Sequence, residues 1–340
     1  MQSAKRILFY VHFNKNNQLS EYVPQQLLGI KPLFHKIFFI SNSVILDDDK
    51  KRLSGLYDDF IQRDNIGFDF AAWRDGIKKI GWKELTKYDS VTMMNDTCFG
   101  PIHAMSTTYE KMEPSNADFW GLTNHGATRV GAAKTGKFIP EHLQSYFICY
   151  SNNVIKSKTF RLFWENVKDY KDVSQVIMNY ETRITEVLVK DGFVYDAYFD
   201  AQEYSAKHHV TDVMNFSELC PLVMINAKMP LIKIKAFTHL PYNQIIKAIK
   251  KTSNYSIDLI HEHIKTMKIP TVNKATFVLI RFKTRLSSSL KNNKTIKGIA
   301  RRHPKMIKFI KKISKRVFGD HTVYMYKPDA EHLKSSSNDN

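Results

Sequence analysis

Polar side chains follow four predicted strands of this sequence, directly after runs of branched and aromatic residues. The strand ends carry Asn14; Ser41, Asn42 and Ser43; Arg63, Asp64 and Asn65; and Asn95 and Asp96. A single asparagine after a strand is ordinary turn chemistry, because its side chain bonds the neighbouring backbone. Four such positions favour a ligand crevice, since ligands of open α/β sheets bind outside the carboxyl ends of the strands.

The sharpest of these strand ends is Asn95-Asp96-Thr97, which follows the run SVTMM and precedes Gly100-Pro101. A carboxylate at this position is predicted to point into the crevice and to hold Mg²⁺ or Mn²⁺, because these hard cations prefer oxygen ligands. The cation would in turn neutralise a diphosphate. An Asx-turn at Asp96 is the alternative interpretation.

The segment after the third strand leads into a helix and carries three further candidates. Gly67 would let the backbone approach a ligand. Asp69 is well placed to cap the helix. Arg74 either binds a phosphate or pairs with a neighbouring aspartate.

The elements that must position these groups alternate between strand and helix. Strands are predicted at 5–13, 36–41, 59–63 and 90–94, and helices at 20–34, 47–57 and 70–80. Because parallel strands need a crossover connection, the alternation predicts an α/β fold with a parallel sheet. Further strands are predicted at 117–122, 146–150 and 193–199, and helices at 160–170 and 175–190. The segment 222–237, with Pro221 before it and Pro230 inside it, is predicted to be strand and turn.

Charge divides the 340-residue chain unevenly. The net charge is +18, from 51 Lys and Arg against 33 Asp and Glu, and 17 of the basic residues lie between Glu262 and Asp320, where no acidic residue occurs. We therefore predict an α/β domain at 1–250, a basic helical segment at 251–320 and a polar tail at 321–340.

The basic segment is predicted to contact an anionic membrane surface through residues 281–318. Within it, residues 305–318 (KMIKFIKKISKRVF) place apolar side chains on one helix face and lysines on the other. Such a helix lies in the membrane interface. A helix docked on the protein's own body is the alternative, and nucleic acid is not expected because the segment has few aromatic residues for base stacking.

The cysteines and the apolar runs bear on the compartment. Cys98, Cys149 and Cys220 have neither a disulfide framework nor a metal-ligand spacing, which favours a reducing compartment. The first residues lack the pattern of a signal peptide, and no apolar stretch reaches the roughly 18 residues of a membrane span. We therefore expect a cytoplasmic protein, peripheral at the inner face of the plasma membrane.

Four motifs, together with their order, carry a resemblance to a known family. They are NIGFDF at 65–70, MNDTCFGP at 94–101, DFWGLT at 118–123 and HLQSYF at 142–147. They resemble the motifs of the rhamnan synthesis protein F family, with the expected gaps, over roughly residues 5–245. The members of that family resemble glycosyltransferases of the GT-A type and act on bacterial cell-surface polysaccharides.

The resemblance implies a GT-A-like sheet that binds a nucleotide sugar, and a rhamnosyltransferase. The donor would be dTDP-rhamnose, the acceptor a lipid-linked saccharide of a growing cell-surface polysaccharide, and the reaction an inversion by single displacement. The predicted donor-binding residues are Asn14, Asn42, Arg63, Asn65, Gly67, Asp69, Arg74, Asn95 and Asp96.

The resemblance also implies a metal site, but this sequence departs from the usual motif at one position. Asn95-Asp96 stands in place of the Asp-X-Asp motif of many GT-A enzymes, and His239 stands where many of them have a late histidine ligand. One carboxylate occurs where two are usual, so the expected divalent cation could be replaced by a basic side chain such as Arg74 or Lys134.

Glycosyl transfer further needs a base that takes the proton of the acceptor hydroxyl. The candidates are Asp118, Glu141 and His142, with Asp118 first because the adjacent Trp120 could form a floor for a sugar; Gln144 is a further candidate for sugar binding. The competing hypothesis is a noncatalytic carbohydrate- or nucleotide-binding subunit of a membrane-associated polysaccharide assembly.

Overall fold

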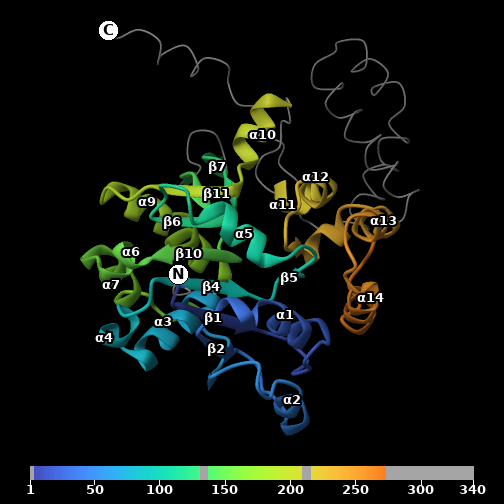
Figure 1. Ribbon diagram of the computed structural model, residues 1–340, viewed down its shortest axis with the longest axis horizontal. Coiled ribbons are helices and arrows are strands. Elements are labelled where there is room, and N and C mark those ends of the chain that lie inside the picture. Colours follow the sequence, from blue (N-terminus) through green and yellow to red (C-terminus); the bar gives the residue numbers. More distant parts are fainter. Residues whose placement is uncertain (1–3, 131–136, 209–215, 273–340) are drawn as a thin grey trace, which may run out of the picture. The chain divides into compact units, whose positions relative to one another are not determined.

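The computed structural model describes residues 4–130, 137–208 and 216–272 (Figure 1). They belong to a compact unit that spans Met1–Thr271. The predicted membrane-binding segment at 281–318, the polar tail at 321–340 and Lys134 lie outside the described residues. Within those ranges, no helix is long and apolar enough to cross a bilayer.

Eight strands of the described residues form the main sheet, in the spatial order β11-β6-β10-β4-β1-β2-β3, with β9 beside β6. They are β1 (Arg6–His12), β2 (Lys36–Ser41), β3 (Asp59–Gln62), β4 (Ser90–Asn95), β6 (Phe119–His125), β9 (His142–Leu143), β10 (Phe147–Ser151) and β11 (Tyr195–Phe199). The strands β3, β2, β1 and β4 are mutually parallel, as predicted. β10 is antiparallel and lies between β4 and β6.

The central strand β1 is buried on both faces of the sheet. Leu8 and Tyr10 point to one side and Ile7, Phe9 and Val11 to the other, and none of these side chains is exposed. A strand buried on both faces has a nearly continuous run of apolar residues instead of an alternation. This explains why the run ILFYV is a reliable strand signal.

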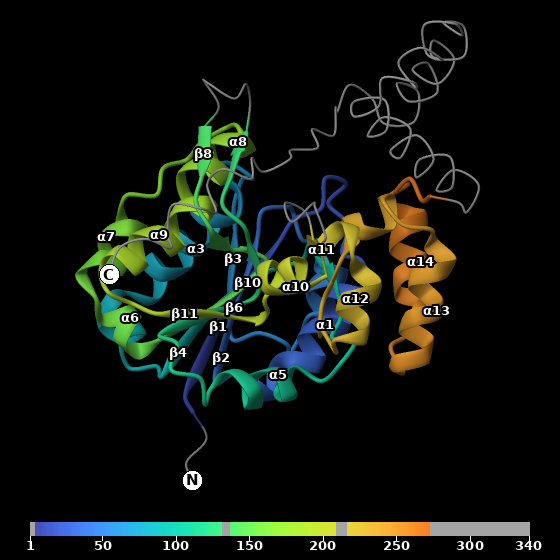
Figure 2. The same cartoon turned by 90° about the horizontal axis from the view of Figure 1, so that it is seen from above.

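Helices cover both faces of this sheet (Figure 2). One side is packed by α1 (Tyr22–Ile30), α5 (Met105–Met112), α12 (Pro221–Asn226), α13 (Tyr242–Thr252) and α14 (Ile257–Thr266). The other side is packed by α3 (Phe68–Ile80), α6 (Asn152–Lys156), α7 (Lys158–Glu165) and α9 (Thr182–Lys190). The structure thus confirms the predicted α/β fold class, with a central sheet flanked by helices.

Shorter elements complete the unit. The remaining helices are α2 (Asp47–Arg52), α4 (Trp82–Leu85), α8 (Val173–Val176), α10 (Ala201–Lys207) and α11 (Phe216–Leu219), with 3₁₀ turns at Lys31–Leu33 and Ile234–Thr238 and a π turn at Ile177–Glu181. Two small antiparallel pairs join β5 (Cys98–Phe99) to β12 (Ile232–Lys233) and β7 (Thr128–Val130) to β8 (Lys137–Ile139).

One predicted segment is corrected. The stretch 222–237 was expected to be strand and turn because of its prolines, but Pro221 begins α12 at its first helical position. A proline is tolerated there because the first backbone N–H groups of a helix have no partner within the helix. Only the short β12 that follows Pro230 is extended.

The close contact between α3 and the sheet depends on Gly76. A Cβ atom on this residue would lie 2.6 Å from Cδ1 of Phe9 on β1 and 2.8 Å from Cδ1 of Ile40 on β2. The helix α3 begins at the carboxyl ends of the strands. The contact at Gly76 therefore fixes the distance between the sheet and α3, and with it the position of the first turn of α3 at the site described below.

We expect Gly76→Ala to lower the free energy of unfolding by about 1–3 kcal/mol, because the added methyl group overpacks the core. This cost outweighs the higher helix propensity of alanine. Lys78→Ala, at an exposed position of the same helix, is the control and should change stability by about 0.5 kcal/mol or less. Denaturant unfolding measures both, and equal stability of the two variants would contradict the packing argument.

Candidate functional site

The carboxyl ends of β1, β2, β3 and β4 meet at one edge of the sheet, called here the site edge, because these strands are parallel. The predicted residues Asn14, Asn42 and Asn95 follow three of these strands and are therefore brought to this edge. The antiparallel β10 begins at the same edge, where the backbone N–H of Asn95 donates to the carbonyl of Tyr146 at 3.3 Å.

The turns after β1 and β2 are tied together. The Ser43 hydroxyl accepts from the Asn14 backbone N–H at 2.7 Å and donates to the Asn14 carbonyl at 3.0 Å. The side chain of Asn14 accepts from the N–H of Asn16, so Asn14 itself forms an Asx-turn. Asn42 is 4 % exposed, and its Nδ2 is buried without a hydrogen-bond partner among the described residues.

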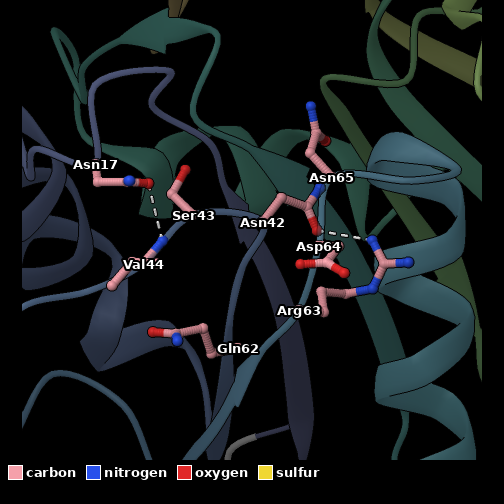
Figure 3. Close-up of a pocket in the computed structure, with 8 residues that line it drawn as sticks. All are labelled: Asn17, Asn42, Ser43, Val44, Gln62, Arg63, Asp64 and Asn65. Atoms are coloured by element: carbon pink, nitrogen blue, oxygen red, sulfur yellow. Dashed lines mark hydrogen bonds between the residues drawn. The ribbon is translucent and has the colours of Figure 1, made fainter.

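A cavity of about 260 Å³ opens at the ends of β2 and β3 (Figure 3). It is lined by Asn17, Asn42, Ser43, Val44, Gln62, Arg63, Asp64 and Asn65. Two hydrogen bonds hold its wall: Val44 N–H donates to Asn17 Oδ1 at 3.1 Å, and Arg63 Nη1 donates to Asn42 Oδ1 at 2.8 Å. The wall of the cavity is thus held by hydrogen bonds, and the exposed Asp64 carboxylate and the Asn65 amide offer acceptors and donors along it.

Asp96 lies directly after β4 and is 8 % exposed. Its Oδ2 accepts from His12 Nδ1 at 2.6 Å and from the backbone N–H of Phe13 at 3.1 Å. The Asp96 carbonyl accepts from the Tyr22 hydroxyl at 2.6 Å. The carboxylate thus joins the end of β1 to the loop after β4, and the Nε2 of His12 is a buried atom for which the described residues provide no partner.

Asp69 does not cap α3, which corrects the predicted role. The N-cap position belongs to Gly67, with a φ of 75°, and no side chain caps the helix. Asp69 lies in the first turn, and its Oδ2 accepts from Asn95 Nδ2 at 2.8 Å. Burial, together with the negative charges of Asp96 and Glu181, raises the pKa of Asp69 to about 7. A carboxyl group that titrates near neutrality therefore sits beside the end of β4.

Both predicted arginines are committed to internal contacts. Arg63 donates to Asp75 and to the carbonyl of Ile66, in addition to Asn42. Arg74 is 8 % exposed and donates to Asp75, to the Val167 carbonyl at 2.8 Å and to Asp169 at 3.0 Å. Of the two predicted roles of Arg74, the structure shows the pairing with aspartate.

Gly67 allows the loop that holds the arginines to lie close to the start of α3. Its N–H donates to the Tyr170 carbonyl at 2.8 Å, and a Cβ on Gly67 would lie 3.0 Å from Asp169 Oδ1. The backbone that approaches Gly67 thus belongs to the loop after α7, which holds the two arginines.

The opposite end of the site edge is built by the loop before β10. The Thr123 hydroxyl at the end of β6 donates to the Gln144 side chain at 2.7 Å and bonds the Tyr146 hydroxyl at 2.9 Å. Glu181, the last residue of the π turn, accepts from the N–H and hydroxyl groups of Ser145. Gln144 is therefore brought to the site edge together with Glu181, a residue that the sequence analysis did not select.

Lys233 is a second residue that the sequence analysis missed. Its Nζ donates to Thr97 Oγ1 at 3.2 Å and lies 4.5 Å from the centroid of the Tyr146 ring. β12 carries it to this place by pairing with β5, where Lys233 is opposite Cys98. The positive charge of Lys233 lowers the pKa of Asp69, against the larger effect of burial.

Asp118 and Trp120 are not brought to the site edge in the predicted way. Asp118 precedes β6, at the amino end of a strand whose carboxyl end reaches the site edge, and its carboxylate accepts from the Val194 N–H at 3.0 Å. Trp120 is 5 % exposed and packs edge-on against Tyr109, with ring centroids 5.1 Å apart. Its ring is part of the hydrophobic core.

Glu141 and His142 lie beside the end of β6. The Glu141 carboxylate accepts from the Tyr195 hydroxyl. The His142 ring stacks on His125, with centroids 4.8 Å apart, and its Nδ1 donates to the Pro140 carbonyl. His142 is 4 % exposed, so these contacts hold β9 against β6.

The predicted metal ligands do not form one donor set. His239 Nε2 faces Glu218 at 3.5 Å, whereas the Asp96 carboxylate is hydrogen-bonded to His12 and Phe13. Throughout the described ranges, no group of three or more His, Cys, Asp or Glu residues is arranged to hold a metal ion. The side chains present therefore do not fit a divalent cation held by Asp96 and His239.

Comparison with known proteins identifies the family. The profile of the family described as rhamnan synthesis protein F matches residues 37–302 of this chain. The chain belongs to the rhamnan synthesis protein F family. The resemblance predicted from the four motifs is thereby confirmed.

A curated relative matches part of the chain. Uncharacterized protein y4gN of Sinorhizobium fredii (strain NBRC 101917 / NGR234) is 29 % identical over 157 residues, which is 46 % of this chain and 39 % of the relative. The match with this chain thus spans about two fifths of the length of y4gN.

Two solved structures match parts of this chain with low TM-scores. The 2-C-methyl-D-erythritol 4-phosphate cytidylyltransferase of Francisella tularensis is 12 % identical, with a TM-score of 0.36, and the match covers 61 % of this chain and 99 % of that protein. Core-mannan synthase A of Aspergillus fumigatus, in a Mn/GDP form, is 7 % identical, with a TM-score of 0.31, and the match covers 56 % and 70 %.

The raised pKa of Asp69 predicts a pH-dependent stability. The folded protein binds this proton more tightly than the unfolded chain, whose aspartate pKa is 3.8, so the free energy of unfolding falls as pH rises from about 4 to about 7. Asp69→Asn cannot titrate, and its stability relative to wild type is expected to rise by on the order of 2 kcal/mol between about pH 5 and pH 8.

Denaturant unfolding at both pH values measures this difference. Asn95→Ala removes a hydrogen bond that lowers the Asp69 pKa, so in that variant the loss of stability is expected to move to higher pH. If the difference in the free energy of unfolding between Asp69→Asn and wild type stays constant with pH, Asp69 titrates normally.

Proposed function

We propose that this protein transfers a sugar from a nucleotide-diphosphate donor, bound along the site edge, to a saccharide acceptor. The observation that carries the proposal is the position of the cavity of about 260 Å³, which lies at the ends of β2 and β3 on the same sheet edge as the polar ends of β1 and β4. Membership of the rhamnan synthesis protein F family supports the same reaction class.

The order of the strands suits an extended donor. The cavity at β2 and β3 would take the nucleoside, with Asn42, Asp64 and Asn65 as hydrogen-bonding groups. Because neighbouring strands lie about 4.8 Å apart, Asn95 and Asp96 on β4 are roughly 10 Å from the end of β2. The diphosphate would lie there, and the sugar would face Gln144 and Tyr146 beyond it.

Asp69 is the group best suited to take the proton of the acceptor hydroxyl. A general base works best when its pKa lies near the working pH, and the pKa of Asp69 is raised to about 7. Its hydrogen bond from Asn95 fixes the carboxylate beside the end of β4. In this proposal Asp69 replaces Asp118, which lies at the amino end of β6.

The proposal also covers the identity of the donor sugar and the cellular place at which the enzyme acts. We infer that the transferred sugar is rhamnose, carried by dTDP, and that the product is a cell-surface polysaccharide; the name of the family, rhamnan synthesis protein F, is what suggests the sugar. Attachment to an anionic membrane would place the enzyme beside a lipid-linked acceptor. Lys247, Lys250 and Lys251 of α13 are exposed while Ile245 and Ile249 of that helix are buried, and these lysines would add to the attraction of residues 281–318 for anionic lipid.

The proposed function is tested by nucleotide release from a panel of sugar nucleotides. We expect release from dTDP-rhamnose in the presence of a saccharide acceptor. Asn65→Ala is expected to raise the dissociation constant of dTDP about fivefold, because one ligand hydrogen bond is lost. Asn243→Ala, exposed on α13, is the matched control and should leave the constant unchanged.

Two results would contradict the proposal in different ways. Binding of a nucleotide sugar without any release would support the alternative, a noncatalytic binding subunit. A protein that binds none of the nucleotides on the panel would refute the assignment of the cavity.

The role of Asp69 is tested separately. Asp69→Asn is expected to lower the rate of transfer about 10²- to 10⁴-fold, because the proton acceptor is lost. In wild type, kcat should rise with pH through about 7 as the carboxyl group ionises. Nucleotide binding should persist in the variant, and a variant with wild-type transfer would exclude Asp69 as the base.

A further inference from the structure

A diphosphate at the end of β4 needs a cation beside it, because charge develops on the diphosphate as the sugar leaves. This inference rests on the proposed function and concerns which group provides that charge. The two arginines near the cavity do not, since their guanidinium groups bind Asp75, Asp169 and backbone carbonyls.

The carboxylates at the site edge are also in use. Asp96 Oδ2 already accepts two hydrogen bonds, and Asp69 Oδ2 accepts one from Asn95. His239 pairs with Glu218. A divalent cation held by both Asp96 and His239 would have to separate His239 from Glu218, so the charge is more readily supplied by a basic side chain that is already in place.

Lys233 meets this requirement. β12 pairs with β5, immediately after Asn95-Asp96-Thr97, and the N–H of Ile234 donates to the Thr97 carbonyl at 3.0 Å. The backbone that carries Lys233 is therefore fixed to the loop that follows β4. Its ammonium group lies over the Tyr146 ring, a face that attracts cations.

The ammonium group of Lys233 also has donors to spare. It can donate three hydrogen bonds, and its hydrogen bond within the described residues goes to the neutral Thr97 hydroxyl. Across those same residues, no carboxylate lies within 4.0 Å of its Nζ. A partly buried lysine without an ion pair, next to the position of a leaving group, is suited to bind an anion.

We propose that Lys233 binds the diphosphate of the donor through its ammonium group, at the place where metal-using transferases hold a divalent cation. Donor binding then requires no divalent cation. Thr97 and Tyr146 are positioning residues that hold the ammonium group beside Asn95.

The test compares dTDP with thymidine as ligands of the full chain, by calorimetry, in EDTA and in Mn²⁺. Lys233→Met keeps the aliphatic stem over Tyr146 but removes the charge, and we expect it to weaken dTDP binding about tenfold or more. Thymidine binding should change less than twofold. Lys233→Arg should recover most of the affinity for dTDP, because it restores the charge.

Lys235→Ala is the matched control, since Lys235 is an exposed lysine of the same segment. It should bind dTDP as wild type does, with or without EDTA. Equal dTDP binding by wild type and Lys233→Met would overturn the role of Lys233, as would wild-type binding that is lost in EDTA and restored by Mn²⁺. A wild-type protein that binds neither dTDP nor thymidine would instead overturn the proposed function.

Discussion

The contact between Asp96 and His12 is the interaction on which the site edge depends. It joins the end of β1 to the loop after β4, and it is buried, with 2.6 Å between Oδ2 and Nδ1. Removing Asp96 would leave the buried His12 ring without a hydrogen-bond partner among the described residues, which costs more than the hydrogen bond itself contributes. Because one oxygen of this carboxylate is structurally engaged, the proposed chemistry is assigned to the neighbours of Asp96, namely Asp69, Asn95 and Lys233.

Charge at the site is held in two groups of residues. Arg63, Arg74, Asp75 and Asp169 form a network of ion pairs that ties α3 to the loops after β3 and α7. Asp69, also on α3, forms a hydrogen-bonded pair with Asn95. Groups that are fixed in this way need little rearrangement when charge develops on a ligand.

The sheet and the row of strand ends could be predicted because they follow from local patterns. The strand 36–41 is found as predicted, and a run buried on both faces, such as ILFYV, is easily read as a strand. The four motifs likewise identified the family. The capping role of Asp69 was mispredicted because capping is decided by backbone conformation. Gly67, in the left-handed conformation, is the N-cap residue, so the helix begins at Phe68 and Asp69 lies inside its first turn.

Other parts of the site could not be predicted because their partners are distant in sequence. Lys233 and Thr97 are 136 residues apart, and no local periodicity records that β12 pairs with β5. Glu181 reaches Ser145 from a π turn, whose extra residue per turn breaks the helical spacing that a sequence pattern would use. Asp118 was favoured for its neighbour Trp120, but strand direction puts it at the far end of β6.

The late position of β12 also has a consequence for the order of assembly during synthesis. All strands of the main sheet precede residue 200, whereas Lys233 is delivered by a two-residue strand that follows them. Long-range contacts form slowly, since the intervening chain must first be ordered. A nascent chain can therefore pair the strands of its main sheet before the ammonium group of Lys233 arrives, whereas one face of that sheet is covered only once α13 and α14 have been made. The proposed binding site is thus assembled late, together with the cover of that face.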